Sequence, residues 1–270
     1  MIESWTEPLK GGATRPLRIH LIGVAGSGMS GLASLLIGLG HRVSGSDRVS
    51  TAETERLQRA GLDFSSPHAA DVVRDADLVI YSSAIKAGNA AFDEAKVLGV
   101  PMLLRAEALA AILNSRRGIV VSGTHGKTTT SSLATHILRA GGLKPSHYVG
   151  AEIPVLGTNA HWSTESDLMV AEGDESDGTL VNYRPAFAIL LNVEAEHLDY
   201  YTDGMAGIER VFNQFLDQVG EGIIYCAEDP GAARLCDGRD QTISYGWDPR
   251  HDVAGKILES RKASTSFELS

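Results

Sequence analysis

Short apolar runs and longer amphipathic segments alternate along the first 115 residues. Runs rich in Leu, Ile and Val are typical of buried strands, and apolar residues spaced three or four positions apart predict helices. The predicted strands are 17–22, 41–45, 62–64, 78–81 and 101–103, and the predicted helices are 32–39, 51–60, 69–75, 89–98 and 106–113. This alternation predicts an α/β fold with a mainly parallel, doubly wound, Rossmann-like sheet.

The alternation continues after a polar break at 114–118, where we place a domain boundary. Predicted strands are 119–121, 147–150, 167–171, 187–191, 222–226 and 241–245, with a strand-like run at 267–270. One predicted helix opens at Lys127, with an apolar pattern through Leu133, Ile137 and Leu138, and another spans 205–219. We therefore expect a lead-in at 1–16, a first domain at 17–115 and a second α/β domain of P-loop type at 116–270.

A glycine-rich loop at 23–31 follows the first predicted strand and leads into a helix, and Asp47 follows the second strand. This arrangement is typical of dinucleotide-binding units, in which the loop and the helix N-terminus bind a pyrophosphate and the acid binds a ribose. A tight turn that merely allows close helix packing would use the same glycines. The pattern predicts a pyrophosphate-binding loop without specifying NAD. Ser46, Ser82 and Ser83 also fall at carboxyl ends of strands, where ligands of such sheets bind.

A second glycine turn lies in the segment 119–130, between an apolar strand and a helix. In a phosphate-binding loop, backbone N–H groups and the helix N-terminus surround an anion and a lysine adds positive charge. Lys127 fits that role, and the hydroxyl of Thr128 is placed to bind Mg²⁺. The usual spacing calls for a glycine where this chain has Val121, and its first glycine is Gly123. We interpret the segment as a shortened phosphate-binding loop.

Two groups of acids follow apolar strands of the second domain, at 172–177 and 192–199. Because Mg²⁺ prefers oxygen ligands and accompanies nucleotide triphosphates, Glu172 is a candidate magnesium ligand. His197 or Asp199 would complete a second site. The alternatives are a solvated acidic turn for the first group and an ordinary loop or core histidine for His197.

Composition and charge exclude several classes of protein. The chain has 270 residues, 43% hydrophobic and 21% charged, with a formal net charge of −10, which argues against a nucleic-acid or anionic-membrane partner. Cys226 and Cys236 are too few for a disulfide scaffold. The acidic segment 1–10 is no signal peptide, and the longest apolar stretch, 32–39, is too short to span a bilayer. We expect a soluble, cytoplasmic protein.

Taken together, these motifs resemble the Mur ligase family of bacterial cell-wall synthesis over about residues 17–250. They include a Gly-Ser-Gly-Met-Ser-Gly loop, Gly-Thr-His-Gly-Lys-Thr-Thr-Thr, Gly-Thr-Asn-Ala, Asp-Glu-Ser-Asp and a His-Leu-Asp segment. The matching segments are 23–31, 44–47, 81–85, 105–107, 123–130, 157–160, 174–177 and 192–201. The short spacing of the second loop is a feature of that family.

The resemblance implies a ligase of peptidoglycan precursor synthesis that uses ATP and Mg²⁺. It would join an amino acid to the lactyl carboxylate of UDP-N-acetylmuramate through an acyl phosphate. Members that add L-alanine are most similar, because Phe212 stands where several relatives carry a carbamylated lysine. Members that recycle a tripeptide are the alternative, and they have a tyrosine where this chain has Ser176.

The resemblance also implies which residues act. Sugar-nucleotide contacts would come from Gly26, Ser27, Gly28, Met29, Asp47, His68, Ser82, Ser83, Thr158, Asn159 and Ser176. ATP contacts would come from Gly123, Thr124, His125, Gly126, Lys127, Thr128, Thr129 and Asn192. The catalytic residues would be Lys127, Glu172 and His197, and the metal ligands Thr128, Glu172 and His197.

Three departures from the family pattern qualify these expectations. Glu196 replaces the usual Asp before the histidine, and His161 stands where an arginine that helps hold the sugar nucleotide is common. Nothing corresponds to the third, C-terminal domain of the family, so we expect a fragment that is inactive alone. The remaining hypotheses are a binding module without catalysis and, least favoured, an NAD-dependent oxidoreductase.

Overall fold

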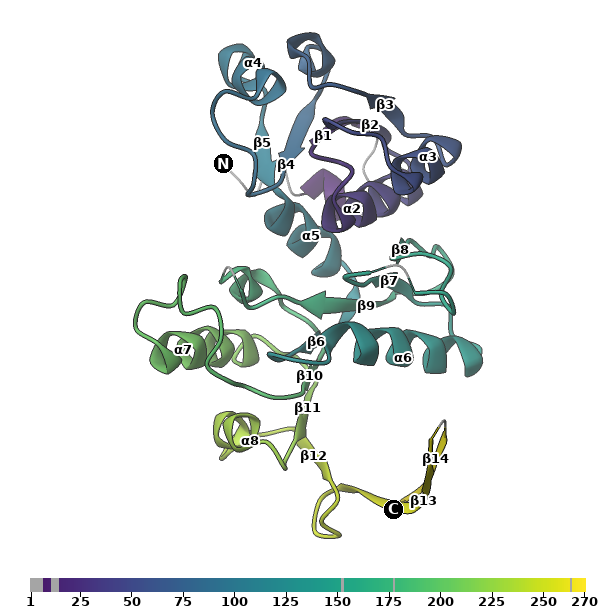
Figure 1. Ribbon diagram of the computed structural model, residues 1–270, viewed down its shortest axis with the longest axis vertical. Helices are drawn as coiled ribbons and strands as arrows, with labels where there is room; N and C mark the ends of the chain where they lie inside the picture. Colours follow the sequence, from purple (N-terminus) through teal and green to yellow (C-terminus); the bar gives the residue numbers. More distant parts are fainter. Residues whose placement is uncertain (1–6, 11–14, 152, 177, 263) are drawn as a thin grey trace. The chain divides into compact units, whose positions relative to one another are not determined.

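Two β-sheets organise the computed structural model, which describes residues 7–10, 15–151, 153–176, 178–262 and 264–270 (Figure 1). The chain forms two compact units. The first combines the residues up to Arg116 with Ser132–Val170, and the second combines Arg117–Ser131 with Ala171–Ser270. Parts of the predicted lead-in, 1–6 and 11–14, lie outside the described residues. No helix in the described part of the chain has the length and apolar character needed to cross a bilayer.

The sheet of the first unit has the strand order β3-β2-β1-β4-β5 with every pair parallel. Its strands are β1 (Arg18–Ile22), β2 (Arg42–Ser46), β3 (Asp63–Ser65), β4 (Leu78–Tyr81) and β5 (Met102–Leu104). Its helices are α2 (Ser27–Gly38), α3 (Ala52–Arg59), α4 (Ala90–Leu98) and α5 (Arg105–Leu113), with 3-10 turns η1 (Glu7–Lys10) and η2 (Ala70–Val73). The doubly wound parallel sheet predicted from the alternation is confirmed.

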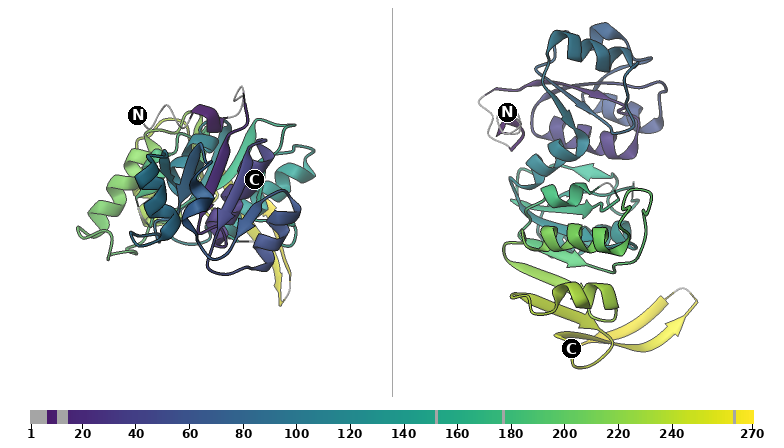
Figure 2. Two further views of the ribbon diagram at one scale, coloured as in Figure 1. Left: turned by 90° about the horizontal axis from the view of Figure 1, so that it is seen from above. Right: turned by 90° about the vertical axis from the view of Figure 1, so that its left-hand side faces the viewer.

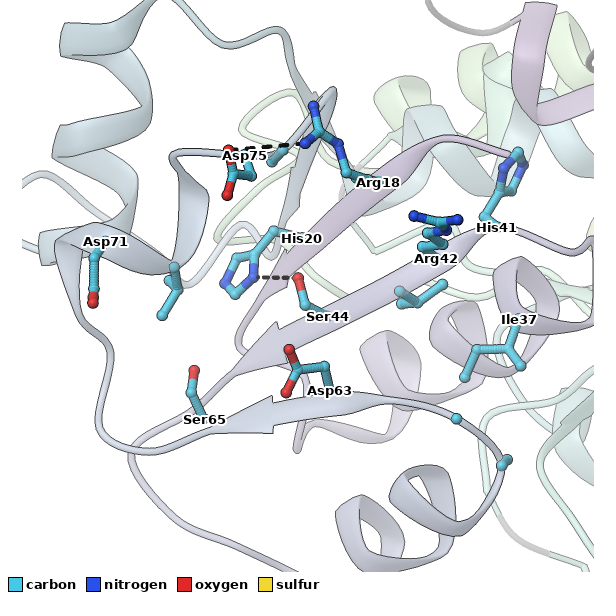
Figure 3. A pocket seen from close by; sticks show the side chains of 15 residues that line it. Arg18, His20, Ile37, His41, Arg42, Ser44, Asp63, Ser65, Asp71 and Asp75 are labelled. Atoms are coloured by element: carbon cyan, nitrogen blue, oxygen red, sulfur yellow. Dashed lines mark hydrogen bonds and ion pairs between the residues drawn. The ribbon is translucent and has the colours of Figure 1, made fainter. Parts of the chain in front are cut away.

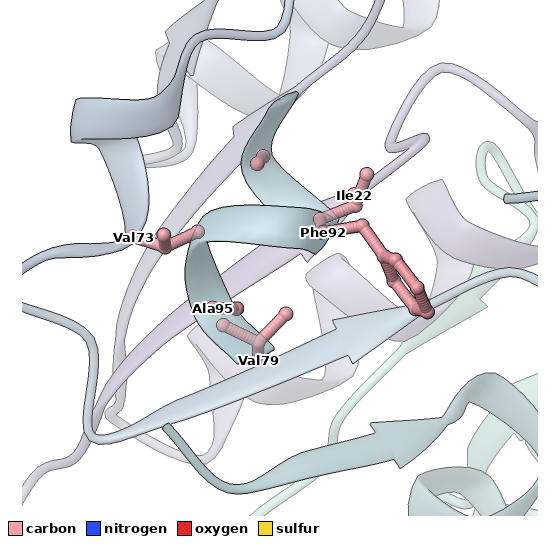
Figure 4. Packing of buried hydrophobic residues seen from close by; sticks show 6 residues of the cluster. Ile22, Val73, Val79, Phe92 and Ala95 are labelled. Carbon is pink, nitrogen blue, oxygen red and sulfur yellow. The ribbon is translucent and has the colours of Figure 1, made fainter. Parts of the chain in front are cut away.

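The helices divide between the two faces of this sheet. Strand order reverses between β1 and β4, so right-handed connections place α2 and α3 on one face and α4 on the other. On the α4 face, Ile22 and Val79 pack with Val73, Phe92 and Ala95, which are all buried (Figure 4). The cluster covers the β1–β4 side of that face.

Helix α2 begins earlier than its apolar pattern predicts. The expected helix starts at residue 32, whereas the observed one starts at Ser27, with Gly26 as an extended N-cap. The glycine loop is therefore short, and its last residues form the first turn of the helix. The predicted helix at 69–75 is only the 3-10 turn Ala70–Val73.

In the second unit, the strand order is β14-β13-β12-β11-β10-β6-β9. The strands are β6 (Arg117–Ser122), β9 (Leu168–Gly173), β10 (Phe187–Leu190), β11 (Gly222–Cys226), β12 (Thr242–Gly246), β13 (Val253–Arg261) and β14 (Ser264–Leu269). The helices are α6 (Lys127–Ala140), of which Ser132–Ala140 belongs to the first unit, α7 (Met205–Leu216) and α8 (Pro230–Cys236), with the 3-10 turn η3 (Thr179–Asn182). Strands β6, β10, β11, β12 and β13 pair in parallel. The first unit also holds the antiparallel pair β7 (Ser146–Tyr148) and β8 (Ala160–His161).

Three elements were absent from the sequence prediction: β8, α8 and most of the β13–β14 hairpin. The hairpin is antiparallel and extends away from β11 and β12 (Figure 2). Helix α8 has two recognisable start signals, an Asp229 side chain that accepts from Ala232 N and Pro230 at the first helical position. The helix has seven residues, which is too short for a helical pattern of apolar residues to be recognised in the sequence.

The buried face of α6 also differs from the predicted pattern. Ser131 and Thr135 are fully buried, whereas Leu133 and Ile137 are 54% and 58% exposed. A small hydroxyl side chain can be buried on a helix when its hydroxyl bonds to a backbone carbonyl of the preceding turn. The Ser131 hydroxyl, for example, donates to the Lys127 carbonyl at 2.6 Å. The helix was predicted correctly, but its inward face was not.

Candidate nucleotide-binding sites

The turn between β6 and α6 has the conformation of a phosphate-binding loop. Gly123 and Gly126 both have positive φ, 139° and 85°. A Cβ on Gly123 would lie 2.9 Å from the Asn192 carbonyl oxygen, so glycine is required there on two grounds. Val121 is fully buried in β6, which means that the loop begins two residues later than in the usual motif.

Asn192, at the end of β10, fastens the loop from the neighbouring strand. Its side-chain oxygen accepts from His125 N at 2.7 Å, and its side-chain nitrogen donates to the His125 carbonyl at 3.1 Å. Its own carbonyl accepts from Thr124 N at 3.0 Å. In this structure Asn192 supports the loop backbone, and this role does not depend on a bound nucleotide.

Lys127 is held by the loop and by one carboxylate. Its Nζ donates to the carbonyls of Gly123 at 2.6 Å and Thr124 at 3.0 Å, and to Glu175 Oε1 at 3.1 Å. Glu175 is 3% exposed, and its Oε2 lies 3.0 Å from Nζ without accepting a hydrogen bond. Burial raises the pKa of Glu175, and the neighbouring Lys127 only partly opposes this effect. The ammonium and carboxylate form the charged centre of the site.

Glu172 and His197 border the same centre. Glu172 Oε1 lies 3.4 Å from the Ser131 hydroxyl, one turn after Thr128 on α6. His197 has a positive φ of 52°, and its Nε2 lies 3.9 Å from Glu175 Oε1, beyond hydrogen-bond distance. The structure therefore brings Lys127, Glu172 and His197 to one end of the sheet, as their sequence positions predict.

The oxygen-rich donor set fits a hard divalent cation. Thr128 follows Lys127 in the first turn of α6, and Glu172 Oε1 lies near Ser131 on the same helix. Glu175 Oε2 is a buried oxygen that lies 3.0 Å from Lys127 Nζ and accepts no hydrogen bond. Within the described ranges, no three His, Cys, Asp or Glu side chains are grouped as for a metal ion. The chain would thus share such a cation with phosphate oxygens or water, as Mg²⁺ sites commonly do.

The glycine loop of the first unit forms a second site. Gly23 N donates to the Ser46 carbonyl at 2.8 Å, and Ala25 N donates to Asp47 Oδ2 at 2.9 Å. Helix α2 begins directly after this loop without any side-chain cap. Its first-turn N–H groups therefore point at an anion-binding position. In this structure Asp47 stabilises the loop through its hydrogen bond with Ala25 N.

Two side chains from the 146–161 segment fasten the first turn of α2. The Tyr148 hydroxyl donates to the Gly28 carbonyl at 2.9 Å, and Asn159 Nδ2 donates to the Ser27 carbonyl at 2.8 Å. A Cβ on Gly28 would lie 3.1 Å from the Tyr148 hydroxyl, and one on Gly31 would lie 3.0 Å from the Tyr148 ring. The packing alternative is thus correct for these two glycines. This packing role is compatible with pyrophosphate binding by the loop, which stays a prediction.

The remaining predicted contacts are distributed over both units. The Met29 side chain is 3% exposed, so only its backbone can face a ligand. Ser82 Oγ accepts from Ala84 N, and the Thr158 hydroxyl donates to the Ala160 carbonyl. Ser83 and Thr129 are exposed, and Ser176 belongs to the second unit. Asp177, the last acid of the first cluster, lies outside the described residues.

Sequence reasoning did not single out Glu175, Tyr148 or His20. Glu175 was available as a member of the acidic cluster, but nothing in its spacing distinguishes it from its neighbours. His20 is detectable as a histidine in the middle of an otherwise apolar strand. It is fully buried, with Nδ1 2.9 Å from Ser44 Oγ and Nε2 2.9 Å from Ser46 Oγ.

The two sheets define the chain as an α/β protein, and each sheet carries a glycine loop of the kind found at nucleotide-binding sites. A family model described as "Mur ligase family, catalytic domain" matches residues 18–117, and one described as "Mur ligase middle domain" matches residues 121–270. The chain belongs to the Mur ligase family.

Relatives of known sequence agree with this assignment. The chain is 38% identical over 254 residues to the UDP-N-acetylmuramate--L-alanine ligase of Pelobacter propionicus, covering 93% of this chain and 55% of that protein. It is 40% identical over 227 residues to the ligase of the same name from Methylococcus capsulatus, covering 83% and 48%. The chain spans about half the length of the curated relatives it matches.

Two solved structures share the fold. The UDP-N-acetylmuramate:L-alanyl-gamma-D-glutamyl-meso-diaminopimelate ligase from Neisseria meningitides matches with a TM-score of 0.83 and 25% identity, over 95% of this chain and 84% of that chain. The UDP-N-acetylmuramate-alanine ligase MurC from Thermotoga maritima matches with a TM-score of 0.79 and 26% identity, over 89% and 55%.

Proposed function

We propose that this chain supplies the sugar-nucleotide and ATP sites of a ligase that joins L-alanine to UDP-N-acetylmuramate in peptidoglycan precursor synthesis. The supporting observation is that one chain carries both an uncapped glycine loop and a phosphate-binding loop whose lysine meets a buried glutamate. The names of the relatives at 38% and 40% identity favour L-alanine as the acceptor. ATP and the sugar nucleotide would place the enzyme in the cytoplasm.

The chemistry would proceed in two transfers. A lactyl carboxylate oxygen of UDP-N-acetylmuramate attacks the γ-phosphorus of ATP, the bond to the bridging oxygen breaks, and ADP leaves. The resulting acyl phosphate reacts with the L-alanine amine, which forms the amide and expels phosphate after losing a proton. Positioning and charge stabilisation are what a protein contributes to such phosphoryl transfer.

Lys127 is the residue best placed to stabilise the transferring phosphoryl group. Its ammonium lies at the loop, already turned toward the carbonyls of Gly123 and Thr124 and toward Glu175. A bound phosphate would compete with these weaker acceptors for the ammonium protons. Glu175 would then keep the lysine aligned, while His125 and Thr124 supply backbone N–H groups held by Asn192.

Mg²⁺ would be held by Thr128 and Glu172, with His197 near a second position. When bound, the cation would neutralise charge on the phosphate oxygens. The sugar nucleotide would use the backbone N–H groups of 26–29, with Asp47 and His68 at the adjoining strand ends and Ser82, Ser83, Thr158, Asn159 and Ser176 as further contacts.

A tripeptide-recycling ligase is the second candidate, because the Neisseria structure with that activity in its name matches with a TM-score of 0.83. Mass spectrometry of the product separates the two when the chain is joined to a third Mur ligase domain, since L-alanine and a tripeptide add different masses to UDP-N-acetylmuramate. An oxidoreductase would instead bind NADH in preference to the sugar nucleotide. A binding module would bind both nucleotides and release no phosphate even when joined to that domain.

The decisive experiment is calorimetric titration of the chain with ATP in Mg²⁺ and, separately, with UDP-N-acetylmuramate. Lys127→Ala is expected to weaken ATP binding by roughly 10- to 100-fold, the range for a charged hydrogen bond, without changing sugar-nucleotide binding. Lys144→Ala is the matched control, because that exposed lysine belongs to the first unit and pairs with Glu165. Equal ATP affinity in Lys127→Ala and wild type would refute the role of Lys127, and failure of the wild type to bind either nucleotide would refute the proposal.

A further inference from the structure

A chain of hydrogen bonds runs from buried His20 to His68, a candidate sugar-nucleotide residue. His20 Nε2 lies 2.9 Å from Ser46 Oγ, and the same oxygen lies 2.9 Å from His68 Nδ1. His20 Nδ1 lies 2.9 Å from Ser44 Oγ. All four side chains belong to the first unit. Ser46 is fully buried, so water cannot replace either histidine as its partner.

The position of His20 in the sheet allows these hydrogen bonds to form. His20 lies opposite Ser44 on β2 and Val79 on β4, so the three side chains share one face. The α4 cluster covers the Val79 side of that face, whereas the β2–β3 side is open. A cavity of about 620 Å³ lies there, lined by His20, Ser44 and Ser65 among others (Figure 3).

A serine hydroxyl between two imidazoles links their protonation states. Ser46 has one hydroxyl proton, so it donates to one ring and accepts from the N–H of the other. Burial lowers the pKa of His20 to about 4, so near neutral pH that ring has a single N–H. If His20 donates from Nε2, then Ser46 donates to His68 Nδ1, and His68 carries its proton on Nε2. If Ser46 donates to His20 instead, His68 carries its proton on Nδ1.

The first arrangement is favoured by the intrinsic tautomer preference of histidine, and the surroundings are compatible with it. Both rings then adopt the Nε2–H form, which is the preferred tautomer of neutral histidine. Ser44, which lines the open cavity, can rotate its hydroxyl to donate to His20 Nδ1. Burial lowers the pKa of His68, and the charges of Asp47 and Arg48 act on it in opposite directions, so the ring is favoured in its neutral form.

We propose that His20 is a positioning residue: through Ser46 it holds His68 as the neutral Nε2–H tautomer, which offers an N–H donor to an oxygen of the sugar nucleotide. The tautomer of His68 is a property of the protein without ligand. The ligand contact rests on the proposed function, because His68 adjoins Asp47 and the glycine loop at the same strand ends.

Nitrogen-15 NMR of histidine-labelled chain tests the tautomer directly. The His68 signals, assigned with His68→Ala, are expected to show a protonated Nε2 and an unprotonated Nδ1. Ser46→Ala is expected to shift them toward a mixture, because the donor to Nδ1 is lost. His136→Ala, at an exposed site on α6, should leave them unchanged. A protonated Nδ1 in the wild type, or no change in Ser46→Ala, would overturn the proposal.

Calorimetry with UDP-N-acetylmuramate tests the contact through a double-mutant cycle. His20→Leu is expected to weaken binding by roughly 5- to 30-fold, and His20→Gln, which can still donate to Ser46, by less. In the His68→Ala background, His20→Leu should have no further effect, because His20 acts through His68. An additive loss would mean that His20 supports only the fold. A wild type that binds no UDP-N-acetylmuramate would refute the proposed function, and the NMR result would still decide the tautomer.

Discussion

Acidification is expected to destabilise the first unit through two buried histidines, His20 and His147. Burial is the main reason that the pKa of each falls from 6.5 to about 4. His147 is further constrained, because Arg139 can only donate and bonds to Nδ1 at 3.2 Å. The proton of neutral His147 is therefore on Nε2, which lies 3.2 Å from the Thr158 carbonyl.

The sign and size follow from proton linkage. Above pH 6.5 both histidines are neutral in the folded and unfolded chain, so they add no pH dependence. Between pH 6.5 and 4 the unfolded chain binds protons that the folded chain does not bind, so the free energy of unfolding decreases as the pH is lowered. A pKa of about 4 against 6.5 corresponds to about 3.4 kcal/mol for each histidine. The two together would remove about 7 kcal/mol, comparable with the whole stability of many domains.

Urea unfolding followed by Trp162 fluorescence measures this effect. Trp162 is buried in the first unit, with the Arg116 guanidinium 3.9 Å above its ring, so its emission should report unfolding there. Replacing Trp5 and Trp247 by phenylalanine removes the other two tryptophan signals. The free energy of unfolding is expected to be level above about pH 7 and to fall steeply toward pH 4.5.

Variants distinguish the histidines from other titrating groups. His20→Gln and His147→Gln should each remove a large part of the pH dependence between pH 6.5 and 4.5, even if they lower stability at pH 7. The remainder includes His68 and His161, whose pKa values burial also lowers. His136→Gln should leave it unchanged, since that residue is exposed on α6. Stability that is level from pH 7 to 4.5 in the wild type would refute the reasoning, as would an unchanged slope in both buried-histidine variants.

Two further pairs of substitutions test packing. Gly31→Ala should destabilise the chain by about 1–3 kcal/mol in urea unfolding, because its Cβ would lie 3.0 Å from the Tyr148 ring, whereas Gly141→Ala, with contacts at 3.5 Å, should be nearly neutral. A stabilising Gly31→Ala would contradict the close approach of Tyr148. Ile137→Ala should cost less than about 0.5 kcal/mol and Leu36→Ala about 2–5 kcal/mol, because Ile137 is 58% exposed and Leu36 fully buried. Equal losses would show that the apolar side of α6 is covered.

The local pattern of residues was sufficient to predict most of the secondary structure and both glycine loops. Apolar runs and glycine turns are determined within about ten residues, so the strand–loop–helix units around Gly26 and Lys127 could be recognised from sequence. The strand β11 was predicted with its observed bounds, Gly222–Cys226. A resemblance to Mur ligases followed from the same motifs, and the family matches confirm it.

The tertiary structure alone decided which side chains meet. Gly28 contacts Tyr148, 120 positions away, and Lys127 pairs with Glu175, 48 positions away, although Glu172 and Asp174 were equally available from the sequence. The apolar pattern of α6 ran through Leu133 and Ile137, whereas its buried positions include Ser131, whose hydroxyl bonds to a carbonyl of the same helix. The periodicity of a sequence predicts the type of a single helix or strand and which of its faces is buried. The partner of a buried polar group depends on which distant element packs against it, and only the folded chain determines that.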